Sequence, residues 1–89
     1  PDLSDADLNE LELRGANLQG VNFCRSSLCW AVLNESNLSR SKFNKAILHK
    51  TEFIHAQLQG AQFVDANLVE ADFHRANLND ANFIGSDLK

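Results

Sequence analysis

Leucine or phenylalanine recurs at every fifth residue along the whole chain, from Leu3 to Leu88. All eighteen positions of this series are Leu or Phe, and it contains every Phe and every Leu of the chain except Leu11. Two residues earlier the side chain is Ala, Ser or Thr in all but three repeats. An α-helix cannot use this period, because five steps of about 100° spread the series over all helix faces. The period therefore predicts a solenoid of five-residue repeats.

Extended backbone accommodates the pattern. We number the places of each repeat from the small residue, so that Leu or Phe is third. In extended backbone the first and third side chains share one face and the second points to the other. The fourth and fifth residues must then turn a corner, and all four glycines of the chain stand in the fifth place: Gly15, Gly20, Gly60 and Gly85.

The spacing of the phenylalanines indicates how many sides close one coil. Phe23, Phe43, Phe63 and Phe83 are twenty residues apart. Four sides of five residues stack them on one side, whereas a coil of fifteen residues scatters Phe over every side. The sequence thus predicts a four-sided parallel coil of about four and a half turns. At a strand spacing of about 4.8 Å, the stack is roughly 20 to 22 Å long.

Segments such as Ala66-Asn67-Leu68 and Ala81-Asn82-Phe83 resemble the motif of the pentapeptide-repeat family, which is Ala, then Asp or Asn, then Leu or Phe, then two variable residues. The resemblance covers the whole chain, with departures at Leu11, Val21, Val32, Lys42 and Ile47. It implies an all-β fold, a right-handed quadrilateral parallel β-helix, as one domain over residues 1–89. The chain begins at Pro1, in register and without Met, so we expect it to be part of a longer chain.

The net charge of -4 argues against nonspecific binding to nucleic acid or anionic membranes. No apolar run is long enough to span a membrane, and no signal segment opens the chain. We therefore expect a cytoplasmic protein without direct nucleic-acid or membrane contacts.

The outward places carry no recognisable catalytic set. Acidic side chains project from a surface rather than into a shared cleft, and no phosphate-binding loop is present. His55 and His74 fall on neighbouring coils of one side, but surface histidine is the favoured interpretation over a metal site. Cys24 and Cys29 flank different corners, which favours free thiols. The sequence predicts no enzyme activity, metal or cofactor.

One side of the predicted coil carries uncharged amides at its second place. Stacked amides can hydrogen-bond along the axis, which favours a structural ladder. A flat docking surface is the alternative. The column consists of Asn17, Asn37, Gln57 and Asn77.

The middle of the chain is basic, because residues 13–50 contain six bases and one acid. Trp and Arg are frequent binding hot spots, and Trp30 is the only large aromatic outside the inward series. We predict that the middle coils bind an acidic partner surface through Trp30, Arg25, Lys45, Lys42 and Arg40.

A structural alternative explains the same residues. Trp30 lies over Lys50 as a cation–π contact, and acids on neighbouring coils pair with bases along the axis. The expected axial pairs are Asp5 with Arg25, Asp65 with Lys45, and Glu70 with Lys50.

A regular solenoid without cleft or cofactor motif offers rigid surface. The leading prediction is a non-enzymatic scaffold that binds an unidentified protein partner, with end-to-end self-association through its open apolar ends. The family resemblance implies an alternative: some members are DNA-mimicking proteins that bind DNA gyrase and confer quinolone resistance or inhibit the enzyme. The basic centre of the chain and the absence of a protruding loop count against this alternative.

Overall fold

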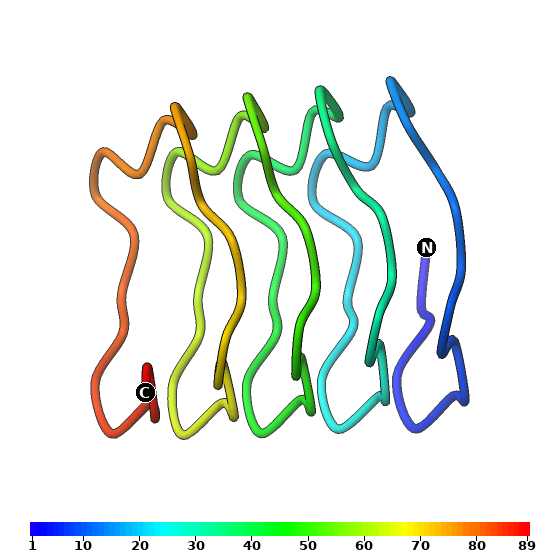
Figure 1. Ribbon diagram of the computed structural model, residues 1–89, viewed down its shortest axis with the longest axis vertical. Coiled ribbons are helices and arrows are strands. Elements are labelled where there is room, and N and C mark those ends of the chain that lie inside the picture. The colour runs from blue at the N-terminus through cyan, green and yellow to red at the C-terminus, as the bar shows by residue number, and fades with distance from the viewer.

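The computed structural model describes all 89 residues and shows a stack of four-sided coils that runs from one terminus to the other (Figure 1). Fourteen isolated parallel bridges join residues twenty apart, from Asp2↔Asn22 to Asn67↔Asp87. The chain contains no helix, and no strand extends beyond a single bridged residue. The predicted four sides of five residues are therefore confirmed.

We number the sides in chain order. Side one holds residues 1–5, 21–25, 41–45, 61–65 and 81–85, and sides two, three and four hold the following five residues of each coil in turn. A corner is the fourth and fifth residue of a repeat. The molecule extends 23 × 23 × 22 Å, so the stack is about as long as it is wide.

Columns of Leu and Phe fill the interior. On side one, Phe43 stacks on Phe23 and on Phe63, with ring centroids 4.8 and 4.9 Å apart. Phe53, from the opposite side, meets Phe43 and Phe63 edge-on at 5.7 and 5.8 Å. Sixteen hydrophobic residues form one buried cluster, while the Leu and Phe of the first and last coils are only partly buried. Side chains thus fill the core along its length and leave no room for a ligand inside it.

The backbone hydrogen bonds leave one N–H group of each repeat to the side chains. The second-place N–H bonds to the coil before, whereas the third-place and fifth-place N–H groups bond to the coil after, as in Phe43 N to Gln62 O at 2.7 Å. The first-place N–H closes a turn onto the third-place carbonyl three residues earlier. No fourth-place N–H donates to a backbone carbonyl. A side-chain acceptor must satisfy this group wherever it is shielded from water.

The Asp or Asn of the second place supplies that acceptor. Wherever one of these residues stands there, its Oδ1 accepts the N–H two residues later, for example Cys24 N to Asn22 Oδ1 at 2.9 Å. This is the Asx turn, which fixes the corner conformation. All ten second-place Asp and Asn residues make it: Asp2, Asp7, Asn17, Asn22, Asn37, Asn67, Asp72, Asn77, Asn82 and Asp87.

The predicted amide ladder on side four is therefore wrong. The oxygens of Asn17, Asn37 and Asn77 accept within their own turns, and no hydrogen bond joins these amides along the axis. The Asn side chains therefore stabilise the corners of their own repeats and do not bond to one another.

In three repeats without a second-place Asp or Asn, an Asn of the preceding coil accepts the fourth-place N–H. Asn34 accepts from Ile54 N at 2.8 Å, and Asn44 accepts from Val64 N at 3.0 Å. Asn9 accepts in the same way from Cys29 N at 2.8 Å. Each of these Asn residues stands in the fourth place, twenty residues before the donor. In these three repeats a neighbouring coil therefore compensates for the missing Asx turn.

Every corner places its fifth residue at positive φ. Gly15 has φ 72°, but Trp30 at 65°, Glu35 at 62° and eleven further non-glycine corner residues also adopt the left-handed conformation. The positive φ and the bond across the corner match a type II turn, which favours Gly at this place. Each non-glycine corner residue costs about 1 kcal/mol of backbone strain.

Replacing the exposed Glu35 by Gly is expected to raise the free energy of unfolding by about 0.5 kcal/mol, because the relieved strain exceeds the extra chain entropy lost by Gly. His74→Gly, one place earlier in a corner and without positive φ, is the control and is expected to destabilise. Urea unfolding measures both variants. A less stable Glu35→Gly variant contradicts the strain argument.

Candidate functional site

The outward His and Cys side chains are spread over several places of the coils. No group of three or more His, Cys, Asp or Glu side chains is arranged to hold a metal ion, although His55 and His74 do lie on adjacent coils. Cys24 and Cys29 are both free and half-buried, as their places in the repeat predicted. The chain has no helix, and therefore none that could span a membrane.

Arg25 is held by a bidentate ion pair. Its Nε and Nη2 donate to the two carboxylate oxygens of Asp5 on the preceding coil, both at 2.9 Å. The hydrogen bond from Arg25 lowers the pKa of Asp5 from its ordinary value, and the same bond raises the pKa of Arg25. The predicted axial pair is confirmed, and it compensates Arg25 for standing directly before Lys45 in the same column.

The stabilising effect of this pair depends on pH. Because folding lowers the pKa of Asp5, its contribution is present above pH 3.8 and disappears as the pH falls through the folded pKa. Asp5→Asn is expected to lower Tm slightly at pH 7 and to have the same Tm as the original protein near pH 2. Thermal melts across this range measure the difference. A difference in Tm that persists at pH 2 contradicts an ionic origin.

The other two predicted axial pairs have different outcomes. Lys50 Nζ lies 3.9 Å from Glu70 Oε1, which confirms that pair. No ion pair joins Lys45 to Asp65, so this prediction is wrong. Asp65 instead leans toward Gly85 on the following coil, where a missing Cβ leaves space for its carboxylate. Lys45 remains an exposed cation without an acidic partner.

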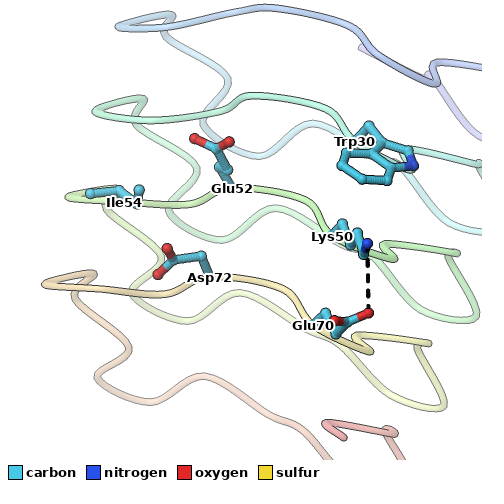
Figure 2. A pocket seen from close by; sticks show the side chains of 6 residues that line it. All are labelled: Trp30, Lys50, Glu52, Ile54, Glu70 and Asp72. Atoms are coloured by element: carbon cyan, nitrogen blue, oxygen red, sulfur yellow. Dashed lines mark ion pairs between the residues drawn. The ribbon is translucent and has the colours of Figure 1, made fainter.

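Trp30 stands at the corner between sides two and three and is 57% exposed. Lys50, on the following coil, places its Nζ 4.4 Å from the centre of the indole ring. The predicted cation–π contact is therefore present, and Figure 2 shows it continuing into the Lys50–Glu70 ion pair. These contacts hold one part of the indole while the rest faces solvent.

The predicted partner-binding residues extend around half of the coil. Arg40, Lys42, Lys45 and Arg25 lie on side one and its two corners, whereas Trp30 lies one full side further on. Ile47, on side two between the two groups, is 47% exposed and connects them with apolar surface.

A shallow depression, of about 370 Å³, lies on the outside of side three. Two apolar side chains, three carboxylates and one ammonium group surround it (Figure 2). The lining residues are Trp30, Lys50, Glu52, Ile54, Glu70 and Asp72. Of these residues, only Trp30 was assigned to a binding surface from the sequence, and Lys50 was predicted only as the cation–π partner of Trp30. The sequence did contain a pattern that could have indicated this surface. Lys50, Glu52 and Ile54 are two residues apart, and Glu70 and Asp72 stand twenty residues after Lys50 and Glu52, in the same columns.

The sequence model of pentapeptide repeats matches eight copies over residues 2–28, 25–56 and 56–89. The chain belongs to the pentapeptide-repeat family. A search of curated proteins found no match to this pentapeptide-repeat protein.

Solved pentapeptide-repeat proteins share its fold. One from Nostoc PCC 7120 is 28% identical, with a TM-score of 0.80, and the match covers 93% of this chain and 84% of that one. A second, from the cyanobacterium Cyanothece 51142, is 31% identical with a TM-score of 0.51, over 93% of this chain and 60% of the other. QnrB1, a plasmid-mediated fluoroquinolone resistance protein, is 28% identical with a TM-score of 0.67, over 99% of this chain and 58% of QnrB1. The chain thus spans less than two thirds of the latter two proteins.

Proposed function

We propose that this pentapeptide-repeat protein is a rigid, right-handed solenoid that binds protein partners in the cytoplasm and catalyses no reaction. The observation that carries the proposal is the closed interior: stacked Phe and Leu columns fill it, and the depression outside side three is a shallow surface feature. A partner must therefore bind the outer faces or the partly exposed ends of the stack. The free thiols Cys24 and Cys29 are compatible with a reducing compartment.

The first surface that we propose is the basic one, on sides one and two of the middle coils. Lys45 has no acidic partner within the chain, and Lys42 on the same side is also exposed. Ile47 and Trp30 add apolar area beside these cations. Aromatic side chains are enriched in the cores of protein interfaces and polar groups surround them at the rim, and the positive charge here favours an acidic partner.

The test compares two variants of equal net charge. Lys42→Gln with Lys45→Gln removes two positive charges from side one, and Gln57→Glu with Asn79→Glu adds two negative charges to side four. The immobilised chain and both variants are exposed to extract of the source cell, and captured proteins are quantified by mass spectrometry. We expect a reproducible acidic protein to be lost from the side-one variant and kept by the side-four variant. Equal capture by all three chains contradicts the proposed surface.

The similarity to a fluoroquinolone resistance protein favours one second candidate, the gyrase-binding function that the family resemblance implied. A DNA mimic needs a continuous acidic face, whereas the middle of side one carries Lys42 and Lys45. We therefore expect no effect of the chain on gyrase supercoiling with or without a fluoroquinolone. Restored supercoiling in the presence of the drug would establish the second candidate instead.

A further inference from the structure

We propose that the depression on side three binds an extended segment of a partner protein that presents one arginine between two apolar residues. The inference rests on the proposed protein-binding function and names a second surface, of opposite charge to side one. It is built on the depression that Trp30, Glu52, Ile54 and Asp72 surround (Figure 2).

The floor of the depression carries unbalanced negative charge. Glu52 and Asp72 are bridged residues of adjacent coils, so their carboxylates stand one strand spacing apart on the same outward column. Three carboxylates and one ammonium group surround the depression, and that ammonium, on Lys50, is engaged by Glu70 and the indole. No base pairs with Glu52 or Asp72. A cation from outside would relieve the repulsion between them.

Each of these carboxylates is fixed through one oxygen. Glu52 Oε1 accepts from Asn34 Nδ2 at 2.9 Å, and Asp72 Oδ1 accepts from His74 N at 2.9 Å. The second oxygen of each group makes no hydrogen bond in the structure. The two free acceptors therefore belong to side chains that are already oriented, which reduces the entropy lost on binding.

The rims of the depression are apolar. Trp30 stands at the corner before side three and Ile54 at the corner after it, with the carboxylates between them. Residues 50, 52 and 54 are two apart, with Glu52 in the extended part of side three and Lys50 and Ile54 at the corners before and after it. A partner segment lying along this side also presents alternate residues to it, so apolar, basic and apolar side chains at every second position match the lining.

Arginine fits the middle position better than lysine. Its guanidinium offers five donors in a planar fork, which can reach two carboxylate oxygens at once and stack against an aromatic ring. A lysine ammonium is a more strongly hydrated point charge, and Lys50 already supplies one to the indole.

The probe is the peptide Leu-Ser-Arg-Ser-Leu with blocked ends. Trp30 is the only tryptophan of the chain and lies on the rim, so its fluorescence reports binding directly. We expect the peptide to change the emission of Trp30 in a saturable manner that weakens with added salt. Peptides with Lys or Glu in place of Arg should bind more weakly and not at all, respectively.

The matched variants keep every local hydrogen bond. Glu52→Gln with Asp72→Asn preserves both acceptors, for Asn34 Nδ2 and for the N–H of His74, and removes only charge. We expect this double variant to bind the Arg peptide about tenfold more weakly than the original chain, with a nearly unchanged Tm. Asp2→Asn with Glu12→Gln removes the same charge outside the depression and should bind like the original chain.

Three results would overturn the proposal. The Arg peptide does not bind, the Glu and Arg peptides bind equally, or the Glu52→Gln, Asp72→Asn variant binds the Arg peptide with unchanged affinity. None of these results affects the capture experiment on side one, which tests the proposed function separately. Conversely, if the original chain and both charge variants capture the same proteins, the proposed surface on side one fails, and the peptide site on side three is not affected.

Discussion

Phe63→Ala is expected to lower the free energy of unfolding by about 3 to 5 kcal/mol, the usual cost of removing a buried phenyl ring. Phe63 is fully buried and stacks on Phe43 and Phe83 at 4.9 Å, with edge contacts to Phe53 and Phe73 at 5.8 Å. Close neighbours on two coils prevent collapse into the vacated space. Phe63→Asp places a charge in the same dry column and is expected to prevent folding.

Urea unfolding followed by far-ultraviolet circular dichroism measures these effects. Phe63→Leu is the matched control, because Leu occupies the equivalent place in the columns of sides two and four, and it should cost much less than Ala. A cooperative transition of Phe63→Asp at the original urea concentration would contradict the assignment of this column to the core.

Asn34→Ala is expected to cost about 1 to 3 kcal/mol, the penalty for leaving a shielded polar group without a partner. Asn34 is 5% exposed and serves two groups, the N–H of Ile54 at 2.8 Å and Glu52 Oε1 at 2.9 Å. Ile54 depends on it because Glu52, in the second place of that repeat, forms no Asx turn.

The same logic predicts a rescue. Glu52→Asp puts an Asx residue into the second place, so the N–H of Ile54 gains a local acceptor and no longer needs Asn34. In the Glu52→Asp background, Asn34→Ala should lose much less stability than in the original chain. A double-mutant cycle by urea unfolding measures this coupling. Additive effects of the two substitutions would contradict the compensation between coils.

The inward columns were predictable from the sequence because they depend only on the period. Phe43 and Phe63 share a column for any coil of twenty residues, and the same count placed Trp30 over Lys50. The axial partner of Asp65 was not predictable in this way. Its column offers Lys45 before it and Gly85 after it, and only the space left by the missing Cβ decides in favour of Gly85.

The role of the second-place Asp and Asn required the backbone hydrogen bonds. The sequence shows that Asn37 recurs in a column of amides, but not that the fourth-place N–H lacks a backbone acceptor. The side-three depression could not be predicted from the sequence for a similar reason. Its residues Glu52 and Asp72 are visible as a column, yet the free oxygens and the hollow depend on side-chain conformation.

The twenty-residue coil places every surface discussed above, and pairs of introduced cysteines test it most directly. In a Cys24→Ser, Cys29→Ser background, Lys42→Cys is combined either with Gln62→Cys, its bridged partner, or with Gln57→Cys, fifteen residues away. Neighbouring strands lie about 4.8 Å apart, within disulfide reach. After mild oxidation, mass spectrometry should find the 42–62 disulfide and no 42–57 disulfide. A 42–57 disulfide, or none in the first pair, would contradict the four-sided coil.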